Sequence, residues 1–181
     1  GFMTEIAKAY GKTLYDLAVE CESVEQMLDE ITTLRQAFEE NPQFLTLMNT
    51  PNLTKEERVS IVDETFGGKI HIYLLNFLKI IAENGTAHEF IDTARQFRNE
   101  YNWENGIETV TVVSAVALGA KQEAQLVEKL SQVTGKTIHL EKKVDPAVIG
   151  GIRLQMEGLQ MDGTVKNKLD AIRSRLLHTI A

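Results

Sequence analysis

The chain has 181 residues, of which 43% are hydrophobic and 25% charged, with three prolines and one cysteine. These proportions exclude a disordered chain and a disulfide-stapled scaffold, and they are ordinary for a globular protein. The net charge of −7 is unevenly divided, because residues 1–105 carry −9 and residues 106–181 carry +2. The acidic part repels nucleic acid and the positive excess is too small for a phosphate-binding surface, so we expect no nucleic-acid partner.

The first 105 residues show the periodicity of amphipathic helices throughout. Capping patterns delimit these helices: Ser23 with Gln26 and Thr54 with Glu57 resemble capping boxes, and Gly85 is expected to end a helix. Short connections predict that neighbouring helices pack antiparallel in a bundle. We expect six helices, at about residues 4–21, 23–40, 42–50, 54–66, 70–84 and 87–103.

The pattern changes at residues 105–106, where we place a domain boundary. β-Branched residues from Val110 to Val116 predict a strand that ends near Leu118. The fold class is therefore expected to be mainly α, with a six-helix bundle over residues 1–105 and a small β-α-β-β-β-α domain over residues 106–181. The elements expected after the first strand are a helix at 120–134, a strand from 137, a hairpin at 152–156 and 159–162, and a basic terminal helix from about 165.

The fifth predicted helix carries more apolar surface than a surface helix needs. Ten of the thirteen residues from Ile70 to Ala82 are apolar, and at 100° per residue they cover roughly 220° of the wheel, against about 100° for a surface helix. This helix is expected to be central in the bundle, to meet another protein, or both. The run is interrupted by Asn76 and Lys79 and is too short for a membrane span of about 20 residues.

No pattern of catalytic or metal-binding residues stands out. The segment Asp162-Gly163-Thr164-Val165 is similar to the motif of haloacid-dehalogenase-like phosphatases, but Gln160 occupies the nucleophile position, and an amide cannot attack phosphorus. The four histidines show no metal-ligand spacing. We therefore expect neither an enzyme nor a cofactor nor a small-molecule substrate.

Several motifs together resemble one family over the whole chain. They are Ala-Lys-Ala-Tyr-Gly-Lys-Thr-Leu-Tyr-Asp-Leu-Ala at 7–18, Ile-Ala-Glu-Asn-Gly at 81–85, Val-Thr-Val-Val-Ser-Ala at 110–115, Ile-Gly-Gly at 149–151 and Asp-Gly-Thr-Val-Lys at 162–166. Their order is similar to that in the delta subunit of bacterial F-type ATP synthases, whose mitochondrial relative is the oligomycin-sensitivity-conferring protein. The sequence departs from the usual family pattern at Thr86 and Lys166, where arginine is common, and in the turn at 157–159.

The resemblance implies a non-catalytic stator component that joins the catalytic head to the peripheral stalk at the cytoplasmic face of the cell membrane. It implies contact with the membrane only through the complex. The helical domain would bind the N-terminal helix of an alpha subunit, and the second domain would bind the b subunits. In the family, a groove between the first and fifth helices receives the N-terminal helix of the alpha subunit. In this chain the residues of that groove would be Ala7, Tyr10, Gly11, Leu14, Tyr15, Ala18, Tyr73, Phe77, Ile80 and Ile81.

Small residues in the first helix are a second reason to expect a partner there. Ala7, Gly11 and Ala18 are adjacent on the wheel and leave room for another helix to approach. A helical adaptor unrelated to ATP synthase would share such a groove, and it is the alternative interpretation. The adaptor would have no affinity for an alpha-subunit terminus.

Overall fold

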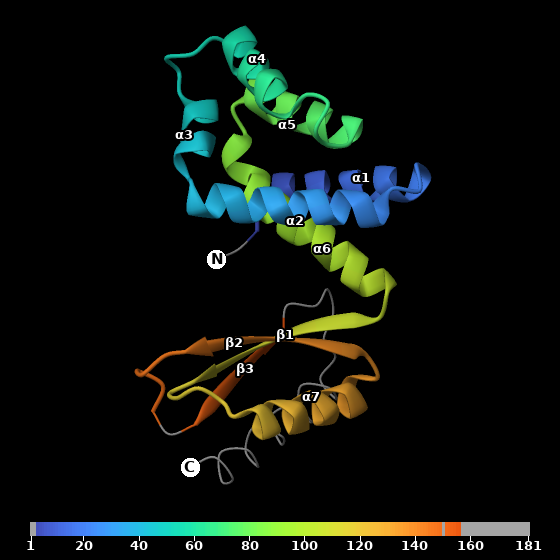
Figure 1. Cartoon of the computed structure of the whole chain (residues 1–181), viewed down its shortest axis with the longest axis vertical. Helices are drawn as coiled ribbons and strands as arrows, with labels where there is room; N and C mark the ends of the chain where they lie inside the picture. Colours follow the sequence, from blue (N-terminus) through green and yellow to red (C-terminus); the bar gives the residue numbers. More distant parts are fainter. Residues whose placement is uncertain (1–2, 150, 157–181) are drawn as a thin grey trace. The chain divides into compact units, whose positions relative to one another are not determined.

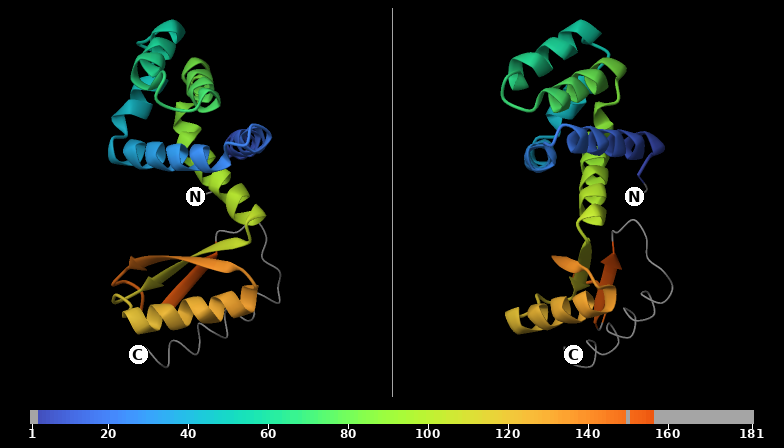
Figure 2. Two further views of the ribbon diagram at one scale, coloured as in Figure 1. Left: turned by 45° about the vertical axis from the view of Figure 1, so that its right-hand side comes forward. Right: turned by 90° about the vertical axis from the view of Figure 1, so that its right-hand side faces the viewer.

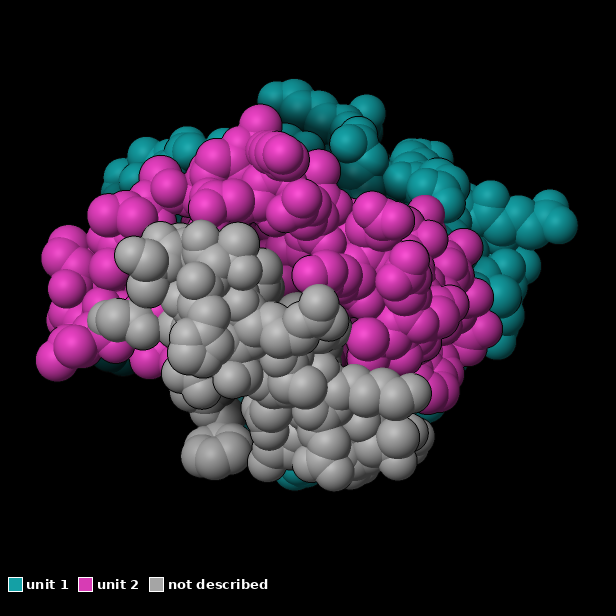
Figure 3. Space-filling model, turned by 90° about the horizontal axis from the view of Figure 1, so that it is seen from below, with its two compact units in different colours: residues 1–100 teal, residues 101–181 magenta. Residues whose placement is uncertain are grey.

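The computed structural model describes residues 3–149 and 151–156. It contains two compact units, residues 1–100 and 101–181, which Figure 3 shows in different colours. The division falls within one helix, five residues before the boundary expected from the sequence. No helix in the described part of the chain is long and apolar enough to cross a bilayer.

Unit 1 is entirely helical in its described residues (Figure 1). Helices α1 and α2 lie side by side, as do α4 and α5, while the last helix runs through the unit and continues beyond it (Figures 1 and 2). The elements are α1 (Glu5–Glu20), α2 (Val24–Glu40), α3 (Gln43–Asn49), α4 (Lys55–Phe66), α5 (Ile72–Asn84), the 3-10 turn η1 (Ala87–Glu89) and α6 (Phe90–Glu104).

Aromatic rings join the helices of unit 1 into one core. Phe38 of α2 stacks on Phe44 at 5.1 Å between ring centroids and meets Phe90 of α6 edge-on at the same distance. Phe77 of α5 lies 6.4 Å from Phe90, and Tyr15 of α1 meets α6 edge-on. Offset and edge-on pairs at these distances are the favourable geometries. Helix α6 is therefore the element against which α1, α2 and α5 are all packed.

Buried Arg58 ties three helices together by their ends. Its guanidinium donates to the carbonyl oxygen of Thr50, just after α3, and to that of Glu83 in the last turn of α5. Carbonyls at helix ends lack intrahelical partners, and a cation there also complements the helix dipole. Arg58 thus satisfies two carbonyl groups that α3 and α5 leave open.

The capping predictions succeed at Thr54 and fail at Ser23. Thr54 and Glu57 form the expected reciprocal capping box at the start of α4, and Gly85 ends α5 in the left-handed conformation with φ of 71°. The Ser23 side chain accepts no cap bond, and its hydroxyl donates to the carbonyl oxygen of Cys21. A serine hydroxyl can bond to nearby backbone on either side, so the pattern alone does not fix its partner.

Unit 2 contains a three-stranded sheet with one helix against it in its described residues. The strands β1 (Ile107–Ser114), β2 (Thr137–Val144) and β3 (Ile152–Met156) lie in the order β2-β1-β3, with β1 parallel to β2 and antiparallel to β3. Helix α7 (Ala120–Thr134) covers one face of the sheet (Figures 1 and 2). The core between them comprises Val110, Val112, Leu126, Leu130 and Ile152.

The sequence predicts the class of this fold correctly, as mainly helical with a small α/β part, but it places one strand end wrongly. Strand β1 ends at Ser114, and Val116, which was expected in the strand, is 65% exposed beyond it. A β-branched residue favours a strand mainly where neighbours cover it, and Val116 is left largely exposed. The second hairpin strand and the terminal helix lie outside the described residues.

A buried acid at the start of β1 is held by a lysine. The Glu108 carboxylate, 1% exposed, accepts from the Lys136 ammonium at 3.4 Å, and that ammonium lies 4.9 Å from the centroid of the Trp103 ring. A buried charge needs such a partner, and a cation over an indole face gains further stabilisation. These contacts join the end of α6, β1 and the residues just before β2 within unit 2.

We expect Arg58→Met to lower the free energy of unfolding by about 1–3 kcal/mol, because two partly buried hydrogen bonds from a buried guanidinium to helix-end carbonyl oxygens are lost. Urea unfolding followed by circular dichroism at 222 nm measures the change. Arg35→Met is the matched control, since Arg35 makes only a partly exposed pair with Glu39 on the same helix, a kind of pair that contributes about 0–1 kcal/mol. Equal losses in the two variants would contradict the role of Arg58.

Candidate partner-binding groove

Helices α1 and α5 leave an apolar groove of about 430 Å³ between them. The two helices run antiparallel, because Tyr10 faces Phe77 while Cys21 faces His71. The groove residues of α1 extend from Ala9 to Leu17, which is about 12 Å along a helix. The residues that line the groove are Ala9, Tyr10, Thr13, Leu14, Leu17, Tyr73, Asn76, Phe77 and Ile80.

The groove has a buried apolar floor and exposed rims. Leu14 and Phe77 are buried, and the ring of half-buried Tyr10 meets Phe77 edge-on at 5.3 Å between centroids. On the α5 rim, Tyr73 is 40% exposed and Ile80 is 49% exposed. An apolar cleft with two phenol groups and a few polar side chains can receive the apolar face of an amphipathic helix.

Five of the ten residues predicted for the site line the groove: Tyr10, Leu14, Tyr73, Phe77 and Ile80. The other five are buried in unit 1 and are not among the lining residues. These are Ala7, Gly11, Tyr15, Ala18 and Ile81.

Gly11 shows what the small residues of α1 make room for. A Cβ atom added there would lie 2.5 Å from Cβ of Gln96 and 2.8 Å from the carbonyl oxygen of Thr93, both in α6. Tyr15, one turn further, packs edge-on against Phe97 of α6. The helix that approaches α1 closely at Gly11 is therefore α6 of the same chain, and not the partner helix expected from the sequence.

The sequence prediction missed four groove residues, Ala9, Thr13, Leu17 and Asn76. On a wheel at 100° per residue, the groove residues of α1 and its buried residues occupy two adjoining arcs, with Leu14 near the border. The α1 residues predicted from the sequence form a single arc that covers the buried residues and only part of the groove residues. Two of the missed residues could have been found from the sequence, because Thr13 and Asn76 are polar and stand beside large apolar neighbours, which is typical of the edge of a helix interface.

One end of the groove is formed by the first turn of α5. His71 caps this helix, with its Nδ1 accepting from the backbone N–H of Tyr73 at 3.1 Å. The Nε2 atom of His71 lies 3.8 Å from Sγ of Cys21. The spacing of the histidines in the sequence predicts no such contact, but the fold brings His71 and Cys21 together across fifty residues.

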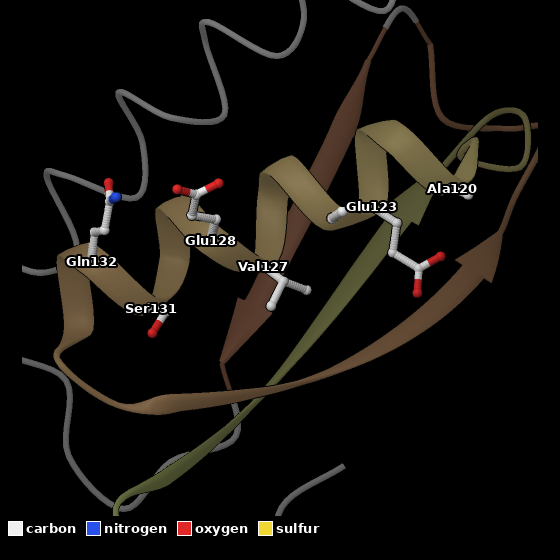
Figure 4. A pocket seen from close by; sticks show the side chains of 7 residues that line it. Ala120, Glu123, Val127, Glu128, Ser131 and Gln132 are labelled. Carbon is white, nitrogen blue, oxygen red and sulfur yellow. The ribbon is translucent and has the colours of Figure 1, made fainter.

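Helix α7 of unit 2 bears a second, more open hollow of about 660 Å³ (Figure 4). The residues that line it all come from α7 and include two glutamates; they are Ala120, Glu123, Ala124, Val127, Glu128, Ser131 and Gln132. One of them, Glu123, is paired with Lys142 of β2 at 2.9 Å. Within the described residues, no group of three or more histidine, cysteine or acidic side chains could hold a metal ion.

The family model of the ATP synthase delta (OSCP) subunit matches residues 6–176. The chain belongs to this family. Among its relatives are the ATP synthase subunits delta of Desulfitobacterium hafniense, 31% identical, and of Lactobacillus acidophilus, 32% identical. Each alignment covers 96% of this chain, and 97% and 95% of the two relatives. A chain of the Toxoplasma gondii mitochondrial ATP synthase hexamer has the same fold, with a TM-score of 0.70 at 20% identity over 96% of this chain and 98% of that one.

As a member of the delta family, the chain is a structural and not a catalytic subunit of ATP synthase. It is a stator component that links the catalytic head to the peripheral stalk, so that rotation is coupled to ATP synthesis. This confirms the resemblance, the stator role and the expected lack of enzymatic function. It also excludes the alternative of an unrelated adaptor.

We expect Gly11→Ala to destabilise the helical unit by up to about 2 kcal/mol. Overpacking costs about 1–3 kcal/mol, while alanine gains at most about 1 kcal/mol of helix propensity over glycine. Urea unfolding at 222 nm measures the difference. Gly119→Ala is the control for steric effects, because a Cβ there meets only a side-chain oxygen of Gln122 at 3.6 Å, so that any loss at this N-cap of α7 comes from the cap and not from overpacking. A more stable Gly11→Ala chain would show that α1 and α6 are not in close contact.

Proposed function

We propose that the groove between α1 and α5 binds the N-terminal helix of an ATP synthase alpha subunit. The proposal rests on membership of the delta family together with one observation, the exposed apolar rim at Tyr73 and Ile80 above the buried floor at Leu14 and Phe77. This partner would cover side chains that unit 1 leaves open to solvent.

The chemistry of the groove suits a tight helix-in-groove contact. Two tyrosines lie on opposite walls, Tyr10 on α1 and Tyr73 on α5, and tyrosine is enriched among the residues that dominate binding energies. A stator must hold under torque, which favours slow dissociation and an affinity of about nanomolar, or roughly −12 kcal/mol. A few buried apolar anchors can supply that free energy.

We further propose that unit 2 binds the b subunits of the peripheral stalk. The opposite net charges of the two parts of the sequence support two different partners. The protein would then lie at the cytoplasmic face of the cell membrane, attached through the complex.

We expect Ile80→Asp to weaken binding of a synthetic alpha-subunit N-terminal peptide of about 20 residues at least 100-fold. A carboxylate on the groove rim would lose an apolar contact and would have to be desolvated beneath the bound helix. Isothermal titration calorimetry measures the affinity, with the peptide taken from the alpha subunit of the same organism.

Ile72→Asp is the matched control for this experiment. Ile72 lies on the same helix and is 56% exposed, but it does not line the groove, so the same change there should alter the affinity less than about threefold. Phe77→Asp would be less informative, because Phe77 is buried against Phe90. Equal affinities of wild type and Ile80→Asp would refute the groove, and no binding by the folded wild-type chain would refute this partner.

The assignment of different partners to the two units gives a separate prediction. Ile80→Asp should bind a soluble form of the b subunits as tightly as the wild-type chain does, because the substitution lies in unit 1. Analytical ultracentrifugation of the mixture measures this. If Ile80→Asp lost both alpha-peptide and b-subunit binding, the assignment of the two partners to different units would be contradicted.

A further inference from the structure

The cap of α5 depends on the protonation state of His71. Nδ1 accepts a hydrogen bond from the Tyr73 backbone N–H, so that nitrogen carries no proton. In the neutral ring the proton is then on Nε2, which faces Sγ of Cys21 at 3.8 Å. Serine, threonine, aspartate and asparagine are the usual residues at this position, and histidine differs from the neutral ones in that it changes charge between pH 5 and 8.

The titratable groups that contact His71 come from three helices. Cys21 lies at the end of α1 and Tyr73 lies on α5, with its ring centroid 5.3 Å from that of His71. Glu30 of α2 accepts from the His71 backbone N–H at 2.6 Å, and this carboxylate offers a protonated imidazole an anionic neighbour.

A second proton on the ring removes the cap. The imidazolium has N–H groups at both nitrogens, so Nδ1 can no longer accept from Tyr73. The positive charge would also lie at the N-terminal end of α5, where the helix dipole disfavours cations. The ring must therefore turn away from the first turn of α5, and Tyr73, which forms part of the groove wall, loses the bond that holds its backbone.

We propose that His71 is a pH-sensitive latch on the groove: the neutral ring holds Tyr73 in the binding position, and the protonated ring releases it. The proposal rests on the function proposed for the groove. Binding of the alpha-subunit helix should select the neutral ring, and the groove should lose affinity as the pH falls through the range in which histidine titrates.

The test compares wild type with His71→Asn, since asparagine is a good cap that does not titrate in this range. Titration calorimetry with the alpha-subunit N-terminal peptide is performed at about pH 8 and about pH 5.5. From pH 8 to pH 5.5 the wild-type affinity should fall about three- to tenfold, as expected for the loss of one cap. The fold-change of His71→Asn over the same range should be less than half that of wild type. His88→Asn is the control, because His88 is an exposed histidine of the same unit and this variant should respond like wild type.

The titratable groups of the peptide act equally on all three proteins, so only the difference between wild type and His71→Asn reports the latch. Identical responses of these two proteins would overturn it. A readout without peptide is the amide chemical shift of Tyr73, which should titrate in wild type and stay constant in His71→Asn. If the peptide does not bind at either pH but this shift titrates, the latch stands and the proposed partner is wrong. If the shift is constant in wild type, the latch is wrong.

Discussion

The close contact between α1 and α6 at Gly11 sets the position from which the groove is built. Because Gly11 has no side chain, α1 packs closely against Gln96 of α6, and the adjoining arc of α1 faces α5 across the groove. Phe77 fills the floor from the α5 side and touches both Tyr10 and Phe90. The groove is therefore a gap that packing leaves between two helices anchored on a common third one, and its width follows from that anchoring.

Helix α5 shows how one apolar helix can serve both a core and a surface. Leu74, Leu78 and Ile81 are buried within the unit, while Ile80 and Tyr73 remain exposed. The sequence indicated an apolar arc too wide for a surface helix and left both explanations open. The structure shows that one part of the arc is buried in the interior of the unit and that another part lines the groove.

The sequence predicted the features that depend on residues close together in the chain, and it did not predict the contacts between segments that are far apart in the chain. The helices, the capping box at Thr54 and the glycine end at Gly85 were predicted because periodicity and local hydrogen bonds determine them. The division of α1 into a buried face and a groove face was not predicted, because it depends on where α6 and α5 lie. The contact between Cys21 and His71 was likewise invisible. The motif Asp-Gly-Thr-Val-Lys at 162–166, one of those that resemble the family, lies outside the described residues.

The aromatic residues of the chain give each unit a spectroscopic signal of its own. The single tryptophan, Trp103, lies at the end of α6 in unit 2, beneath the ammonium of Lys136. Tyr10 and Tyr73 line the groove of unit 1. Indole emission thus follows the melting of the α/β part, while tyrosine absorbance follows mainly the helical part and whatever fills its groove, because three of the four tyrosines lie in unit 1 and only Tyr101 lies in unit 2. One sample, observed at two wavelengths, can show whether the two halves of the stator link unfold together or in sequence.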